Sequence, residues 1–327
     1  MLITHTVDVT ELPAAERFDF WADLVAREAA PQRISSAHAG AFNGWAQITE
    51  LGQLRLTSFR YPSLDTSRTS RLIRQSDPEL YQLALPTSGR SAIAQQDRES
   101  ALRPADFTLL DTSRPHEASH HPVASGSAAP ELASSVTVLI PHALLPVPRD
   151  QVGRLLAARL PSGEGMGALL AGFLLQIARH PGQYQPSDAA FLGSTALSLI
   201  AATIAQQLDV ERALPAQVQR DALRARVTAF VDAHLGDADL DPRTVAAAHH
   251  VSVRTLHRLF QDEQTSVAEL IRARRLERCR QDLTNPLYRG TPIHAVAARW
   301  GLRDKAHFSR LFSATFGRSP QAYRDGT

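Results

Sequence analysis

Several features that are common in other protein classes are scarce or missing from this chain of 327 residues. Its single cysteine, Cys279, excludes an internal disulfide framework and a zinc site built from several cysteines. The longest apolar runs, such as residues 168–178, are shorter than the roughly 20 residues that span a bilayer. The first residues also lack the basic and apolar regions of a signal peptide. We therefore expect a cytoplasmic protein with no membrane segment.

Motifs that carry common enzyme chemistry are also missing. The sequence contains no nucleophile elbow, no phosphate-binding loop and no paired-carboxylate motif. The glycines at residues 162–167 lack the G-K-[ST] ending of a phosphate loop and a preceding strand, so they indicate a turn. We expect no enzymatic activity and no cofactor.

The composition is that of a globular protein, but charge is distributed unevenly along it. Hydrophobic residues make up 43% and charged residues 21%, and the length permits two domains, each with its own core. From Arg220 to the end, 18 Lys and Arg outnumber 12 Asp and Glu, whereas the preceding part is mildly acidic. A basic end on an acidic body indicates one domain that faces a polyanion, the alternative being a solvated basic surface.

The N-terminal half alternates between helix-like and strand-like patterns. Residues 11–28 place five apolar side chains near helical spacing: Leu12, Phe18, Trp21, Leu24 and Val25. Short strand-like pieces separated by turn residues follow within residues 34–141, and they predict a β-barrel or sandwich. These pieces are residues 46–62, 80–86, 90–96, 107–111 and 135–141. Residues 112–131 are polar and rich in small side chains, which predicts a surface loop.

Long helices rich in Ala and Leu are expected next, at residues 150–160, 165–180 and 187–209, the last of them capped by Ser187. This last helix is apolar on more than one face, so it should be buried against the barrel, another helix or a second copy of the protein. Residues 211–221, which Pro215 interrupts, are the expected linker between domains of residues 1–215 and 216–327.

The C-terminal part contains two copies of one small helical unit, at residues 242–263 and 292–316. Asp241-Pro242 and Thr291-Pro292 predict a capped start for the first helix of each unit. A tight connection then leads to an amphipathic helix capped by Ser252 or Asp304. Each second helix carries apolar side chains on one face and basic, hydrogen-bonding side chains on the other. This is the layout of a helix-turn-helix, whose second helix can lie in the major groove of DNA.

The stretch between the two units, residues 266–283, is predicted to be a single helix. At about 1.5 Å per residue it would span roughly 27 Å. That length is close to the roughly 34 Å between successive major-groove faces on one side of B-DNA. The repeat therefore predicts one chain that reads two groove segments.

These residues resemble the AraC/XylS family of bacterial transcription regulators. The resemblance is carried by "VSVRTLHRLFQDEQTSVAELIRARRLERCRQDL" and "IHAVAARWGLRDKAHFSRLFSATFGRSPQAYR", and it covers roughly residues 222–325. It implies an all-helical domain that binds promoter DNA and favours activation through RNA polymerase. The candidate DNA-binding residues are Ser252, Arg254, Thr255, His257 and Arg258 in the first unit, and Arg303, Lys305, Ala306, His307 and Arg310 in the second.

The N-terminal part resembles the cupin-like sensor domain found in a subset of these regulators, on residues 80–117 and 138–146. The resemblance implies an α+β chain with a small β-barrel that binds an effector, followed by helices at residues 150–210 that form a homodimer. Five residues are candidates for lining the pocket: Trp45, Tyr61, Tyr81, Arg90 and His116.

Two other readings of the sequence stay open. Cupin-like barrels can hold a metal through histidines, and His116, His120 and His121 are candidates for a metal-dependent enzyme, although no carboxylate ligand stands at a suitable spacing. The other alternative is an interaction module that no longer binds DNA.

Overall fold

The computed structural model describes residues 1–123, 131–208, 216–261, 265–285 and 288–325. The chain folds into two compact units, Met1–Ala222 and Leu223–Thr327. Part of the expected linker, residues 211–215, lies outside the described residues. The rest of it forms the start of helix α6 (Ala216–Ala233), which begins in the first unit and continues in the second.

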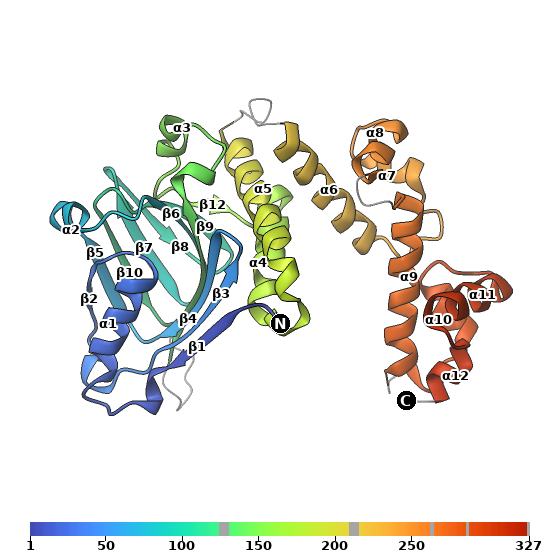
Figure 1. Cartoon of the computed structure of the whole chain (residues 1–327), viewed down its shortest axis with the longest axis horizontal. Helices are drawn as coiled ribbons and strands as arrows, with labels where there is room; N and C mark the ends of the chain where they lie inside the picture. The colour runs from blue at the N-terminus through green and yellow to red at the C-terminus, as the bar shows by residue number, and fades with distance from the viewer. Residues whose placement is uncertain (124–130, 209–215, 262–264, 286–287, 326–327) are drawn as a thin grey trace. The chain divides into compact units, whose positions relative to one another are not determined.

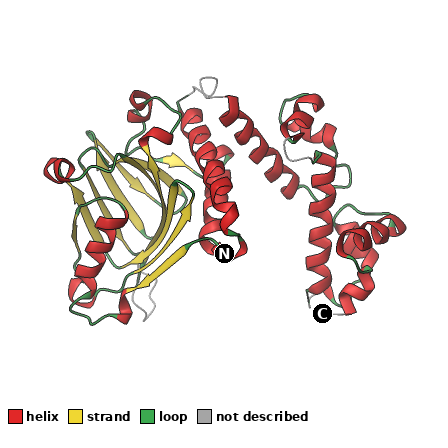
Figure 2. Ribbon diagram, in the orientation of Figure 1, coloured by secondary structure: helices red, strands yellow, loops and turns green. Residues whose placement is uncertain are grey.

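Two antiparallel sheets make up most of the N-terminal unit, and they face each other (Figures 1 and 2). In spatial order, the seven-stranded sheet consists of β1 (Thr4–Asp8), β3 (Trp45–Leu51), β4 (Leu54–Tyr61), β11 (Ala133–Pro141), β6 (Leu80–Ser88), β9 (Asp106–Asp111) and β12 (Leu160–Pro161). The five-stranded sheet consists of β2 (Arg33–Ser35), β5 (Leu64–Arg68), β10 (His116–His121), β7 (Arg90–Gln95) and β8 (Arg98–Leu102). Among the described strands no ladder joins the two sheets, so the predicted barrel is an open, two-sheet form of the cupin-like arrangement.

The five strand-like segments of the sequence all form strands, namely β3 and β4, β6, β7, β9 and β11. The predicted surface loop at residues 112–131 is wrong in part, because His116–His121 form β10 between β5 and β7. The segment "HEASHH" has little intrinsic preference for a strand, but pairing on both sides satisfies its backbone groups and decides its conformation. Residues 124–130 lie outside the described part.

Helices surround the two sheets. They are α1 (Arg17–Glu28), α2 (Ser70–Gln75), α3 (Arg149–Gly153), α4 (Gly165–Arg179) and α5 (Ala189–Gln207), with short 3-10 turns at η1 (Val9–Glu11), η2 (Ala39–Ala41), η3 (His142–Leu144), η4 (Pro181–Gln183) and η5 (Pro186–Asp188). The predicted Ser187 cap of α5 is wrong: Asp188 holds the N-cap position, and its side chain makes no capping bond to α5.

The helices α4 and α5 pack on each other and on strands β3, β4 and β11 of the seven-stranded sheet (Figure 1). Gly193 lets α5 approach the sheet closely, because a Cβ at this position would overlap the carbonyl oxygen of Leu51. By length and composition alone, Pro186–Gln207 could cross a membrane, but 61% of its apolar window is buried inside the structure. The packing of α5 is that of a core helix.

The C-terminal unit is helical and is organised along α9 (Val267–Thr284). Its other helices are α7 (Pro242–Ala248), α8 (Val253–Leu259), α10 (Ile293–Arg299), α11 (Lys305–Phe316) and α12 (Pro320–Asp325). Val267 and Ile271, near the start of α9, belong to one buried core with α6, α7 and α8. Leu276 and Cys279, further along, belong to a second core with α10 and α11. Figure 1 shows α7 and α8 beside one end of α9, and α10 to α12 beside the other.

Candidate nucleic-acid interface and ligand cavity

The first candidate recognition helix, α8, is fixed at its start by a side-chain cap. The Oγ of Ser252 accepts a hydrogen bond of 3.0 Å from the backbone N–H of Thr255, and the two hydroxyl oxygens lie 2.8 Å apart. Leu256 and Leu259 are buried, whereas the side chains of Arg254, His257 and Arg258 are exposed, with Thr255 half-buried between them. The predicted division of α8 into a core face and a basic outer face is therefore present.

The second candidate recognition helix, α11, repeats this design with different chemistry. The carboxylate of Asp304 accepts a 2.9 Å hydrogen bond from the backbone N–H of His307, and this bond holds the pKa of Asp304 below its usual value. Phe308 and Phe312 are buried in the second core. The residues predicted to face DNA are all exposed: Arg303, Lys305, Ala306, His307 and Arg310.

Helix starts elsewhere in the unit test the capping predictions. Asp241 caps α7 as predicted, with one carboxylate oxygen accepting from the N–H groups of Arg243 and Thr244 at 2.8 and 2.7 Å. Thr291 does not cap α10, so that prediction is wrong. The N-cap position of α10 is occupied by Pro292, whose side chain offers no hydrogen-bonding atom.

A buried arginine on α9 connects the two halves of the unit. The Nε of Arg275 donates a 3.1 Å hydrogen bond to the carbonyl of Leu235, and its Nη2 donates to the carbonyl of Asp237. The same guanidinium lies under the turn that leads into α11, where a Cβ at Gly301 would come within 2.8 Å of it. Gly301 has φ of +73°, so both its conformation and the contact favour glycine. Arg275 thus joins the segment between α6 and α7 to the second helix-turn-helix.

The exposed faces of α8 and α11 suit contacts with nucleic acid. Arg254 and Arg258 are four residues apart and lie on one side of α8. A guanidinium can bond two acceptors at once, as presented by guanine O6 and N7 or by a phosphate, whereas the ammonium of Lys305 acts as a point charge. The two helices therefore offer related but different sets of donors.

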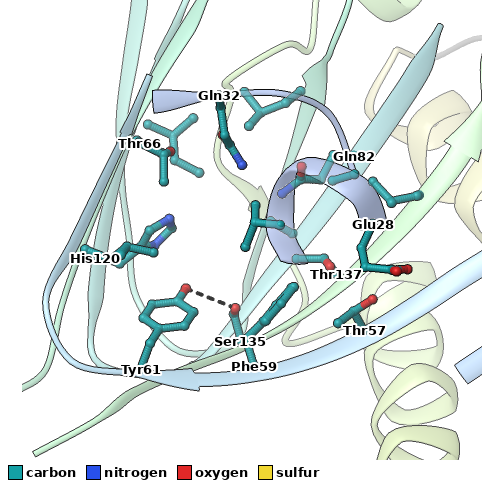
Figure 3. A pocket seen from close by; sticks show the side chains of 18 of the residues that line it. Glu28, Gln32, Thr57, Phe59, Tyr61, Thr66, Gln82, His120, Ser135 and Thr137 are labelled. Atoms are coloured by element: carbon teal, nitrogen blue, oxygen red, sulfur yellow. Dashed lines mark hydrogen bonds between the residues drawn. The ribbon is translucent and has the colours of Figure 1, made fainter. Parts of the chain in front are cut away.

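The N-terminal unit contains a partly open cavity between the two sheets, with α1 along one wall (Figure 3). It offers about 80 Å³ to the centres of water-sized molecules. Figure 3 shows His120 and Tyr61 on one side, with Gln82 and Thr137 across from them. Among the side chains drawn there is one hydrogen bond, 3.3 Å long, between the hydroxyl oxygens of Tyr61 and Ser135.

Two of the five predicted pocket residues, Tyr61 and His116, line this cavity, and the other three do not. Trp45 lies on β3 beneath the guanidinium of Arg60, 4.3 Å from the ring centre. Tyr81 is buried against His142, with ring centres 4.2 Å apart, and Arg90 is exposed at the start of β7. On a strand, successive side chains point to opposite faces, so aromatic or charged character alone does not say which residues reach the cavity.

The sequence prediction missed His120 as a cavity residue. His116, Ala118 and His120 are alternate residues of β10, and all three line the cavity. This period of two would have identified them if the sequence had shown that β10 is a strand. Burial lowers the pKa of His120 to about 4 and also lowers the pKa of His116. Both imidazoles are therefore neutral near pH 7.

Three histidines of β10 were candidate metal ligands. His116 and His120 share the cavity face, whereas His121, next to His120, is exposed and does not line the cavity. In the part of the chain that the structure describes, no three His, Cys, Asp or Glu side chains are grouped so that they could hold one metal ion.

Known proteins resemble both units. Residues 21–205 match the AraC-binding-like domain family, and residues 245–326 match a helix-turn-helix domain family. A transcriptional activator named NphR, from Rhodococcus sp, is 30% identical over 275 residues, which cover 84% of this chain and 78% of that protein. A protein described as an uncharacterized protein in nit 5'region, from Bacillus sp. (strain OxB-1), is 25% identical over 247 residues, covering 75% of this chain and 91% of that one.

A solved structure resembles this one over most of its length. The AraC-like transcriptional activator CuxR superposes with a TM-score of 0.51 at 20% sequence identity, covering 84% of this chain and 94% of that chain. At this identity the likeness shows a shared fold.

Proposed function

Because the chain belongs to the AraC family of DNA-binding transcription regulators, we propose that it reads two adjacent major-groove segments of promoter DNA, one with α8 and one with α11. One observation carries this proposal: two capped helices with exposed basic faces are packed at opposite ends of a single helix of 18 residues, α9. Such a helix is about 27 Å long, which suits the spacing of successive groove segments.

The proposed DNA contacts are the exposed residues of the two helices. Arg254, His257 and Arg258 would face the first segment, and Lys305, His307 and Arg310 the second. Ser252, Thr255, Arg303 and Ala306 would lie at the edges of the two contacts. The hydroxyl groups of Ser252 and Thr255 bond to each other, and that of Ser252 also caps α8. These bonds support a positioning role for both residues.

The remaining assignments complete the proposal. The unit of residues 1–215 senses a small molecule in its cavity and forms a homodimer through residues 150–210, and residues 216–327 bind DNA. The protein acts as a transcriptional activator in the cytoplasm, through RNA polymerase, and is not an enzyme. The names of NphR and CuxR as transcriptional activators support activation.

Binding measurements with the full chain and the DNA upstream of its own gene test the central assignment. We expect Arg258→Ala and Arg310→Ala each to weaken specific binding by about 1 to 3 kcal/mol, since each removes one bidentate contact between a guanidinium and DNA. Arg243→Ala, at the exposed start of α7, is the matched control and should change affinity little. Wild-type promoter affinity in both recognition-helix variants would refute their proposed roles.

A further inference from the structure

The charge of the cavity restricts what can occupy it. None of the described residues that line it is Lys or Arg, and its one carboxylate, Glu28, is paired with Arg55 at 3.0 Å and is partly exposed. The two lining histidines, His116 and His120, are neutral near pH 7 because burial lowers the pKa of each. An anion would find no cation in the wall, and a cation would have to compete with Arg55 for the carboxylate of Glu28. An ionised ligand would therefore leave water without a free partner of opposite charge, which is strongly unfavourable. The wall therefore favours an uncharged ligand.

Several polar groups of the wall are nevertheless without a partner. The hydroxyls of Thr57 and Thr137, whose residues are only 2% and 7% exposed, and the amide of Gln82 make no side-chain hydrogen bond to any other residue that the structure describes. Gln82 is half-buried, and none of the three groups is among the fully buried polar atoms that lack a partner, so each is open to the cavity. These three groups come from β4, β11 and β6, so they converge on the cavity from adjacent strands of one sheet. They offer donors and acceptors to a ligand.

The histidines across the cavity add further hydrogen-bonding capacity. The Nδ1 of His116 donates to the carbonyl of Arg114 at 3.2 Å, so in the neutral ring Nε2 is an acceptor. The Nδ1 of His120 is 2.8 Å from the Oγ of Ser91, which leaves its Nε2 for another partner.

Aromatic rings form much of the remaining wall. The centroids of Trp21, Phe59 and Tyr61 lie 5.9 to 6.2 Å from one another, and Tyr61 also contacts the ring of His120 at 5.6 Å. Aromatic side chains favour edge-to-face and offset contacts with another ring. The free space, about 80 Å³ for the centres of water-sized molecules, suits a compact ligand.

From these features we propose that the cavity binds a small, uncharged aromatic molecule that carries one hydroxyl or amide group. The ring packs among Trp21, Phe59 and Tyr61, and the polar group bonds to the unpartnered side chains of the seven-stranded sheet. This inference rests on the proposed role of the cavity as the effector site.

Four probes that share a six-membered ring and one substituent test the ligand class: benzyl alcohol, benzoate, benzylammonium and cyclohexylmethanol. Binding to the full chain near pH 7 is measured by calorimetric titration and by the thermal unfolding midpoint. Benzyl alcohol should bind at least about tenfold more tightly than either ion, because the wall has no cation for benzoate and its one carboxylate, Glu28, is already paired with Arg55. It should also bind more tightly than the non-aromatic alcohol. Equal binding of benzoate or benzylammonium, or no binding of benzyl alcohol at millimolar concentration, contradicts the proposal.

Variants locate the probe. Thr137→Val removes a cavity hydroxyl at nearly constant volume and should weaken benzyl alcohol binding by roughly 2- to 12-fold, the range expected for one neutral hydrogen bond. Thr108→Val is the matched control, because the buried hydroxyl of Thr108 is also unpartnered but does not line the cavity. Ala84→Leu should fill the cavity and abolish binding, with folding verified by circular dichroism. Equal effects of the two threonine variants would place the probe elsewhere and overturn the inference.

Promoter affinity measured on the same samples separates this inference from the proposed function. If benzyl alcohol binds as predicted but the chain does not bind promoter DNA, the proposed function is wrong and the ligand class stands. If promoter DNA is bound specifically but the charged probes bind as well as benzyl alcohol, the ligand class alone is wrong.

Discussion

Single residues distinguish the two recognition helices. The apolar residues of α8 and α11 occupy similar buried positions, but their outer faces differ: arginines dominate α8, whereas α11 begins with Lys305. Lys305 is also the only lysine in the sequence. This gives a chemical probe that reports on one recognition helix alone.

Acylation by an amine-reactive reagent, followed by peptide mass spectrometry, uses this property. If α11 lies in the groove, specific DNA should slow acylation of Lys305 strongly, because the duplex covers its ammonium group. The N-terminal amine serves as the internal control and should react at an unchanged rate. Equal reactivity of Lys305 with and without specific DNA would argue against groove insertion of α11.

The buried His120 predicts a dependence of stability on pH. Its pKa is about 4 in the folded protein, against a usual value of about 6.5. Between these two values the unfolded chain binds more protons than the folded one, so the free energy of unfolding falls as the pH drops through this window. The loss should reach up to about 3 kcal/mol.

Calorimetric unfolding of the full chain near pH 7 and pH 4.5 measures this effect. His120→Asn should reduce the difference in stability between the two pH values, whereas His121→Asn, on the exposed face of the same strand, should retain it. The buried His116 has a lowered pKa as well and should leave part of the difference in place. A pH dependence that is the same in both variants would contradict this role of His120.

At the scale of elements, the C-terminal unit could be predicted closely from the sequence, because its signals are local. Asp241, Ser252 and Asp304 cap the helices expected of them, and the joining helix predicted at residues 266–283 forms α9 one residue later. Caps and apolar periodicity act within a few residues, so the sequence alone reveals them. The wrong prediction at Thr291 is a shift of one residue in the start of α10.

Elements of the N-terminal unit could be predicted only in part, because strand pairing there is long-range. β10 was missed since its stability comes from β5 and β7, which lie far from it in the sequence. The cavity residues depend on which face of each strand is turned inward, and this explains why Tyr61 and His116 were found while His120 and Gln82 were not. The same dependence on strand faces explains why Trp45, Tyr81 and Arg90 do not line the cavity.

The contacts of Arg275 predict coupling between the two halves of the DNA-binding unit. Arg275→Met should remove the bonds to the carbonyls of Leu235 and Asp237, leave them unpaired and loosen the turn at Gly301. We expect this substitution to lower the affinity for DNA with both groove segments intact by about tenfold. The affinity for DNA in which the second segment is scrambled should change much less.

Arg272→Met is the matched control, since Arg272 is exposed on the same helix. Anisotropy titrations with the two DNA duplexes give the ratio of affinities directly. A ratio equal to that of the wild-type protein would show that Arg275 stabilises the fold without positioning the second recognition helix.

At the scale of the whole molecule, we assign ligand sensing to one unit and DNA binding to the other. The N-terminal unit surrounds a cavity whose one charged side chain, Glu28, is paired with Arg55, and the C-terminal unit carries the excess of basic residues and the two proposed recognition helices. Two recognition helices in one chain lengthen the DNA site that a single polypeptide can specify, since each groove segment contributes its own base contacts. The central claim is therefore that α8 and α11 read separate, adjacent segments.

Hydroxyl-radical footprinting of the wild-type protein, Arg258→Ala and Arg310→Ala on the DNA upstream of its own gene tests this claim most directly. We predict two protected segments about 10 base pairs apart for the wild type. Arg258→Ala should weaken protection of one segment and Arg310→Ala that of the other, at protein concentrations where both variants still bind. Loss of the same segment in both variants, or a single protected segment in the wild type, would contradict the account.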